Sequence, residues 1–148
     1  MTAPVDEQCL QAIATRLGLI RKINGYRSDL GLRVIRWRRS IDESDLPCLA
    51  ISDGSRSISY KYGDCDLEIP VLIEAKMKTT DVDTDAPDLA VDLYQSLTGW
   101  DFSSTPIVKL TLESIEPKIP ETGSSMLSVE MRFRLTTRAK AGDLTTTP

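Results

Sequence analysis

The sequence predicts an α+β fold: a mostly antiparallel sheet with two helices packed on it, in the order α-β-β-(β)-β-α-β-β. Two segments repeat apolar residues every three or four positions, as amphipathic helices do. Other segments alternate apolar and polar residues, as strands with one buried face do. The chain has 148 residues, 41% of them hydrophobic, which suffices for one domain with its own core. We place that domain in residues 1–138 and expect a flexible tail at 139–148.

The first helix is expected at residues 5–22. Four residues there lie three or four positions apart and form one apolar stripe: Leu10, Ile13, Leu17 and Ile20. We expect Asn24 and Gly25 to end this helix, because both residue types tolerate the left-handed backbone that follows many helices.

Three or four strands are expected next. Residues 32–39 carry four arginines and have no clearly apolar face, and residues 47–52 form a second, short strand. A hairpin around 53–65, expected to be mobile, leads into the clearest strand, at 67–77. Pro70 inside that strand indicates an edge position or a bulge. The apolar residues of the strand occupy every second position: Leu67, Ile69, Val71, Ile73, Ala75 and Met77.

A second helix follows an acidic loop at residues 79–87. We expect Asp85 to cap the helix and Pro87 to lie near its first turn, where a missing N–H costs nothing. Gly99 is expected to end the helix. Its apolar stripe repeats every four residues: Leu89, Leu93 and Leu97.

Two long strands complete the predicted fold. Residues 108–112 and 127–135 alternate apolar and polar side chains, as antiparallel neighbours do. The link at 116–125 is long for a tight hairpin, so we expect it to project from the body.

Composition weighs against several classes of protein. The chain has no histidine, which removes the commonest general base at neutral pH, so we expect no enzyme. The three cysteines lack the spacing of a zinc site or a disulfide framework, which favours buried thiols. A net charge of −4 weighs against nucleic-acid binding. We find neither an apolar run near the roughly 20 residues of a membrane span nor a secretory signal, so we expect no membrane and synthesis in the cytoplasm.

Two acidic patterns in the sequence resemble sites that bind a metal ion. The sequence DVDTD at 81–85 resembles the start of a calcium loop, but it lacks the central glycine and the distal glutamate. Asp64, Asp66 and Glu68 alternate along a strand and could bracket a divalent ion. The same alternation is typical of the wet face of a strand. We therefore expect no metal and no cofactor, and keep a divalent-metal-dependent phosphoesterase or nuclease as the alternative function.

A short basic cluster contains Arg36, Arg38 and Arg39 with Trp37 between them. Such a cluster could stack on and pair with nucleic acid, but the acidic chain favours a protein interface, where Arg and Trp are frequent anchors. We predict that it joins copies of the chain head to tail, basic surface against acidic surface. Its predicted partners are acidic residues of a neighbouring copy: Asp42, Glu43 and Asp45.

The segment INGYRSDLGLRVIRWRRSIDESDLPCLAIS, residues 23–52, resembles the N-terminal half of tail terminator proteins of long-tailed bacteriophages, also called tail completion or minor tail proteins. The matching features are a first helix, an N-G-Y-x-[ST]-D-x-G turn and an arginine-rich strand. An acidic turn ending in L-P and a short apolar strand follow. A closing strand with Gly142-Asp143 after it also matches.

The resemblance implies a structural protein without a catalytic site: a hexameric ring on the last ring of the tail tube, which ends tail polymerisation and meets the head-side connector. DNA would pass through the lumen without specific binding. The ring would assemble in the host cytoplasm and lie at the head-proximal end of the virion tail. A different ring-forming protein of the virion, such as a head–tail stopper or the tail tube protein, is kept as an alternative. In this setting the hairpin is predicted to reach the tube or connector through Arg56, Tyr60, Lys61 and Tyr62.

Overall fold

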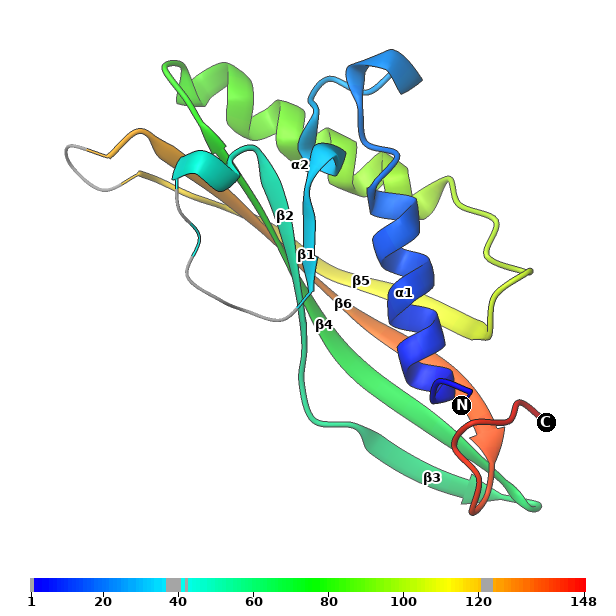
Figure 1. Cartoon of the computed structure of the whole chain (residues 1–148). Helices are drawn as coiled ribbons and strands as arrows, with labels where there is room; N and C mark the ends of the chain where they lie inside the picture. Colours follow the sequence, from blue (N-terminus) through cyan, green and yellow to red (C-terminus); the bar gives the residue numbers. More distant parts are fainter. Residues whose placement is uncertain (1, 37–40, 42, 121–123) are drawn as a thin grey trace.

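The computed structural model describes residues 2–36, 41, 43–120 and 124–148. It is a single α+β domain in which two helices, α1 (Val5–Leu17) and α2 (Val82–Thr98), pack on one face of a six-stranded sheet (Figure 1). The predicted fold class and order of elements are therefore confirmed. The strands are β1 (Val34–Arg36), β2 (Cys48–Asp53), β3 (Ser57–Lys61), β4 (Asp64–Lys78), β5 (Ile107–Lys118) and β6 (Met126–Lys140).

The strand order is β1-β2-β4-β6-β5, with β3 also paired to β4. Only β1 and β2 run parallel among these pairs; the other pairs are antiparallel. β2 and β3 pair with successive stretches of the same side of β4, and Pro70 falls between the two stretches. Its carbonyl accepts the Gly54 amide at 2.9 Å. Pro70 thus lies at a local edge, as predicted, where its missing N–H leaves no ladder bond broken.

The central pair of strands, β4 and β6, builds the core. They pair over 15 residues, from Asp64 opposite Lys140 to Lys78 opposite Met126. Alternate residues of both strands point toward the helices and are buried, which confirms the predicted alternation. Phe133 of β6 is the largest of the fully buried side chains. The apolar stripes of both helices pack on this face, so that one continuous cluster joins helices and sheet.

The first helix is shorter than predicted. α1 ends at Leu17, where the Gly18 amide still donates to Ala14. Residues Lys22–Asn24 form a separate 3-10 turn, and Gly25, with φ of +89°, ends that turn instead of the helix. Ile20 remains buried because its carbonyl accepts the Gly31 amide at 2.8 Å, which draws the chain back over the helix end.

The second helix begins earlier than predicted. α2 starts at Val82, so the acidic sequence is helix and not loop, and Pro87 lies inside it. A proline there removes one bond to the Asp83 carbonyl, a cost that the packing of the apolar stripe offsets. Asp85 accepts the Thr79 hydroxyl at 2.6 Å and so anchors the first turn to the end of β4. Gly99 ends the helix as predicted.

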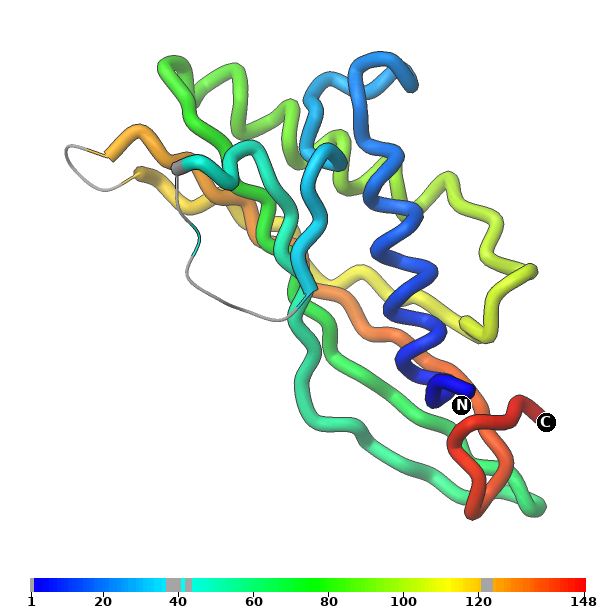
Figure 2. Tube along the Cα trace, in the orientation of Figure 1, coloured from blue at the N-terminus to red at the C-terminus, as the bar shows by residue number. Residues whose placement is uncertain are grey.

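The closing strand extends two residues beyond the predicted boundary at 138. β6 continues to Lys140, and the small side chain of Ala139 is buried against Val5 and Cys65. The last residues then fold back, and the Leu144 carbonyl accepts the Val5 amide at 2.7 Å. The two termini consequently lie side by side (Figure 2). Sequence reasoning missed this because one alanine and one turn carry no periodicity.

Candidate interaction surfaces

Arg36 is engaged within its own chain. Its guanidinium donates two hydrogen bonds to the Glu7 carboxylate of α1, at 3.0 and 3.1 Å, and lies 4.0 Å from Asp53 of β2. Arg56 lies 2.6 Å from the same Asp53 and 2.8 Å from Asp6. These five residues form an ion-pair cluster that ties β1, β2 and the residue before β3 to the first turn of α1. Bidentate pairs of this kind are among the stronger charged contacts.

The other predicted interface residues are only partly described. Asp45 accepts a hydrogen bond from Arg33 at 2.9 Å, so this acidic group also has a partner in its own chain. Glu43 starts the 3-10 turn Glu43–Asp45. Trp37, Arg38, Arg39 and Asp42 lie outside the described residues. Arg36 and Asp45 thus each pair with another residue of the same subunit, Arg36 with Glu7 and Asp45 with Arg33. The sequence did not predict these pairs, because spacing along the chain does not show which opposite charge lies nearest in the fold.

The face of the sheet that points away from the helices, here called the outer face, carries rows of paired charges. Arg134 of β6 donates to Glu68 of β4 and Glu113 of β5, both at 3.1 Å. Arg138 donates to Asp66 at 2.6 Å, and this hydrogen bond holds the pKa of the Asp66 carboxyl below its usual range. Cross-strand pairs of opposite charge are what a solvated sheet face shows.

The arginine–carboxylate pairs of the outer face involve residues of the alternative function, a metal-dependent phosphoesterase or nuclease that would use Asp64, Asp66 and Glu68. Asp66 and Glu68, two of its three carboxylates, each accept a hydrogen bond from an arginine. Within the described ranges no group of three or more His, Cys, Asp or Glu is placed to hold a metal ion. The acidic residues at 81–85 serve the start of α2 instead: Asp81 accepts the Thr84 hydroxyl at 2.8 Å.

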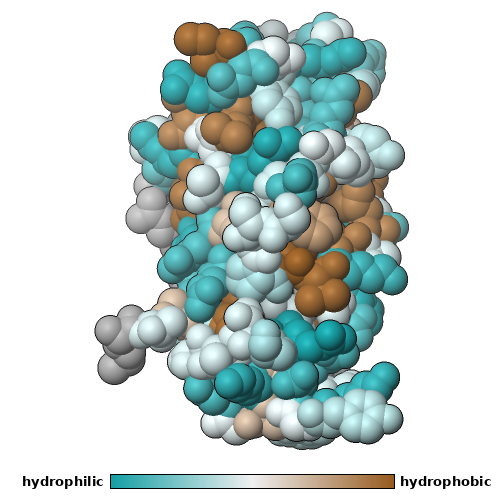
Figure 3. Space-filling model, turned by 90° about the vertical axis from the view of Figure 1, so that its right-hand side faces the viewer, coloured by the Kyte–Doolittle hydropathy of each residue, from teal (hydrophilic) through white to brown (hydrophobic). Residues whose placement is uncertain are grey.

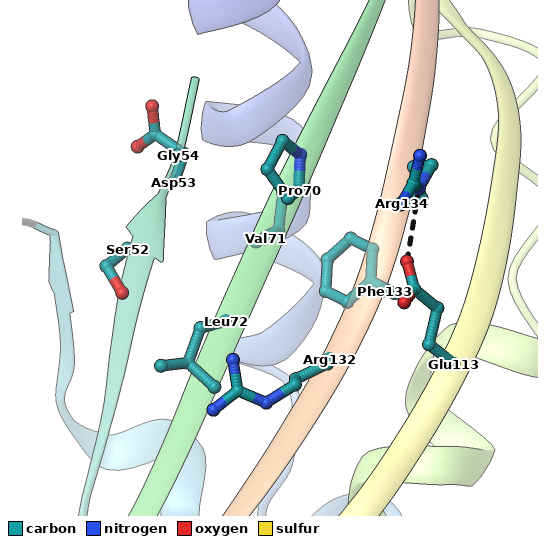
Figure 4. A pocket seen from close by; sticks show the side chains of 10 residues that line it. All are labelled: Ser52, Asp53, Gly54, Pro70, Val71, Leu72, Glu113, Arg132, Phe133 and Arg134. Atoms are coloured by element: carbon teal, nitrogen blue, oxygen red, sulfur yellow. Dashed lines mark hydrogen bonds and ion pairs between the residues drawn. The ribbon is translucent and has the colours of Figure 1, made fainter. Parts of the chain in front are cut away.

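A shallow hollow of about 380 Å³ interrupts the outer face near Pro70 (Figure 4). Figure 4 shows Arg132 extended toward Leu72 on one side of it, and the Arg134–Glu113 pair on the other. The floor combines the ring of Pro70 with apolar and charged side chains of β4 and β6. The hollow is therefore a gap between ion pairs on the solvent-exposed face of the sheet.

The hairpin of β3 and β4 exposes aromatic residues at its tip. Tyr60 is 73% exposed and Tyr62 is 95% exposed, and the Lys61 ammonium lies 5.7 Å from the centre of the Tyr62 ring. Tyr62 and Gly63 form the turn, with φ of 51° and 81°. Positive φ at both positions defines a type I′ turn, which usually carries Asn-Gly. Of the four hairpin residues singled out from sequence, three lie at the tip, whereas Arg56 joins the ion-pair cluster.

A small apolar groove lies at the start of α2, where that helix meets the ends of β5 and β6. Its volume is about 310 Å³. Ile119, just after β5, is 86% exposed beside it, and Asp83 and Lys118 are its charged members. Sequence reasoning missed this groove, because the start of α2 and the end of β5, which form its walls, are far apart in the sequence. The apolar lining residues are Val82, Ala86, Pro87, Pro117, Ile119 and Leu127.

The remaining surface offers no large apolar patch on the side seen in Figure 3, where hydrophobic residues form small areas separated by hydrophilic ones. Patches of that size are normal on soluble proteins and mark no partner by themselves. The three cysteines are free thiols and buried, as predicted. No helix in the described part of the chain has the length and apolarity to cross a membrane.

Within the segment that carries the resemblance, several residues at 27–31 have structural roles. Ser28 donates its hydroxyl to the fully buried Asp92 of α2, and the Arg27 amide donates to the same carboxylate at 3.0 Å. Asp29 accepts the Lys22 amide at 2.9 Å, which closes the turn. A Cβ on Gly31 would lie 2.6 Å from the Gly18 carbonyl oxygen, so the crossing needs glycine. Residues 23–31 connect α1, α2 and β1 in this way, and we call them the joint.

The chain matches no family model and no curated protein.

Proposed function

We propose that this protein is a tail terminator subunit of a long-tailed bacteriophage, which forms a ring on the end of the tail tube and ends its polymerisation. The observation that carries the proposal is the joint at residues 23–31. The residues that resemble the terminator turn are the ones that set how α1, α2 and β1 meet, through Asp92 and the close contact of Gly31 with Gly18. The resemblance thus concerns the architecture of the domain and not a surface loop.

The proposed mechanism is steric and electrostatic. One rim of the ring binds the tube, and the opposite rim has a different surface, so that no further tube subunit adds there. The opposite rim meets the head-side connector. The paired charges on the outer face suit a protein that DNA passes without being held, because phosphate binding needs unpaired basic groups.

Two measurements on the purified full-length protein test this function. Sedimentation and negative-stain images should show closed rings, and addition of the protein to polymerising tail tube protein should give tubes capped at one end. A chain that stays monomeric and leaves tube growth unchanged contradicts the proposal. Open tubes formed by the protein alone would instead identify a tube protein, and rings that bind the connector but not the tube would identify a stopper.

A further inference from the structure

The contact between copies needs surfaces that are not already occupied within the subunit. Arg36 and Asp45, which the sequence suggested for this contact, have partners in their own chain. Two features of the described chain keep exposed apolar or aromatic groups: the hairpin tip, here called the knob (Tyr60, Lys61 and Tyr62), and the apolar groove at the start of α2. They lie at opposite ends of the molecule (Figure 1).

The knob is held in place before any partner binds. The Gly63 carbonyl accepts the Ala141 amide at 2.9 Å, so the folded-back end of the chain fixes the turn. Behind it, Cys65 is buried with Val5 and Ala139. Tyr62 has a positive φ that is unfavourable for a side chain of its size, and its ring is almost fully exposed.

The groove is complementary to the knob in chemistry. Its lining is mainly apolar, which suits a tyrosine ring, and Asp83 lies exposed at its edge in the first turn of α2. Lys118, the basic member of the groove, lies near Glu116 and Glu130 of its own chain, at 3.8 and 3.9 Å. Among the described residues no salt bridge engages Asp83 or Lys61, although Lys61 contacts the Tyr62 ring and its charge helps to lower the pKa of Asp66. An acidic residue in the groove and a basic residue on the knob would attract each other across a contact between copies.

We propose that the Tyr62 ring of one copy inserts into the α2 groove of the next copy, with Lys61 directed at Asp83 of that copy. Knob and groove are different surfaces, so the contact is heterologous, and heterologous contacts form a ring when the rotation between copies closes. The inference rests on the proposed function only in the assumption that these contacts close into a ring. It also assigns the hairpin to the neighbouring subunit in place of the tube or connector.

Two variants remove one side of the contact each. Tyr62→Asn removes the ring from the knob but keeps the turn, because Asn-Gly is the favoured pair in a type I′ turn. Ile119→Ser removes an exposed apolar side chain from the groove, so it leaves the core intact. Each variant should weaken self-association at least about tenfold in sedimentation, with an unchanged melting temperature. Tyr94→Ser, which changes an exposed tyrosine of α2 outside both surfaces, is the matched control.

Mixing the two variants distinguishes a heterologous contact from other arrangements. The Ile119→Ser chain keeps its knob and the Tyr62→Asn chain keeps its groove, so an equimolar mixture should form heterodimers and nothing larger. A second test reverses the charges: Lys61→Glu and Asp83→Lys should each weaken association, and the double variant should recover it. Wild-type association in Tyr62→Asn, or a mixture without heterodimers, overturns the contact.

The outcomes separate this contact from the function of the ring. If Tyr62→Asn forms normal rings that no longer bind tubes, the hairpin faces the tube, the contact is wrong and the terminator function stands. If the variants behave as expected but wild-type rings never cap tubes, the contact stands and the terminator function is wrong. A wild-type chain that remains monomeric overturns the contact, whatever its effect on tubes.

Discussion

Gly31 lies where the chain, after leaving α1, passes back over the end of that helix. A Cβ at this position would lie 2.6 Å from the Gly18 carbonyl oxygen and 2.7 Å from that of Leu17. Both atoms belong to backbone that the helix holds in place, so neither can move aside cheaply. The glycine is required by this close approach and not by an unusual φ.

We expect Gly31→Ala to lower the free energy of unfolding by about 1–3 kcal/mol, the usual cost of forcing extra atoms into a packed site. Urea denaturation followed by circular dichroism measures the change. Gly99→Ala is the control, because the nearest atom to its Cβ is 3.3 Å away and its φ is −87°. A Gly31→Ala protein as stable as the control would contradict the close approach.

Cys9 is a buried thiol on the core face of α1. Burial raises the pKa of its thiol to about 11, and a hydrogen bond with Thr137 offsets part of that rise. In the unfolded chain the thiol loses its proton near its ordinary pKa, about 8.5. Between these two values the unfolded state binds fewer protons than the folded state, so stability falls as the pH rises.

Replacing the thiol should therefore change the alkaline pH dependence of stability. Cys9→Ala should unfold with a shallower loss of stability above pH ~8.5 than the wild type, by up to ~1.4 kcal/mol per pH unit. Denaturation at several pH values up to the folded pKa of about 11 measures this slope. Ile13→Val, which changes core packing without a titrating group, should keep the wild-type slope. Equal slopes in all three proteins would count against a raised Cys9 pKa.

At the scale of elements, the ion-pair cluster ties the short strand β1 and its neighbour β2 to the first helix. β1 has only three residues, and its Arg36 side chain reaches Glu7 of α1 and Asp53 of β2. Arg56, just before β3, makes a similar link to Asp6 of α1 and Asp53 of β2. Because the Arg36 side chain is only 18% exposed, this cluster is screened less by solvent than the pairs on the outer face.

Arg36→Glu should destabilise the subunit, because it places a third carboxylate beside Glu7 and Asp53. We expect the free energy of unfolding to fall by about 2–3 kcal/mol. Arg21→Glu, a change at an exposed position, is the control and should unfold like the wild type. If Arg36→Glu kept full stability but lost assembly, Arg36 would act at the interface, as its sequence context alone suggested.

The elements with one buried face could be predicted from sequence, whereas their ends could not. The alternation in β4 and β6 predicted both strands, since a period of two has only one structural meaning at that length. The end of α1 depended on Gly31, and the start of α2 depended on Thr79 and Asp85. Gly31 and Thr79 lie outside the helices, so the apolar period of the helices does not indicate them.

At the scale of the whole molecule, many of the described charges are paired within the chain, while the knob and the groove each expose apolar or aromatic groups. A ring held by arginines and acidic loops would be dominated by screened electrostatics. A ring held by tyrosine insertion would be dominated by apolar burial, which salt does not screen.

The salt dependence of self-association should reflect the apolar contact. Between about 0.1 M and about 1 M NaCl the Debye length falls from about 10 Å to about 3 Å. We expect the association constant to change by less than about tenfold over this range, with the small loss due to Lys61 and Asp83. Sedimentation of the wild type and of Asp83→Lys measures it. Rings that dissociate completely at the higher salt would favour the arginine interface.

The sequence by itself determined the fold class, the order of elements, the buried thiols and the exposed hairpin tip. These depend on local periodicity, on turn residues and on composition, which a chain carries before it folds. Only the tertiary structure decided that Arg36 pairs with Glu7 and that α2, β5 and β6 enclose a groove. Both depend on which distant residues become neighbours, and that choice belongs to the packing of the whole chain.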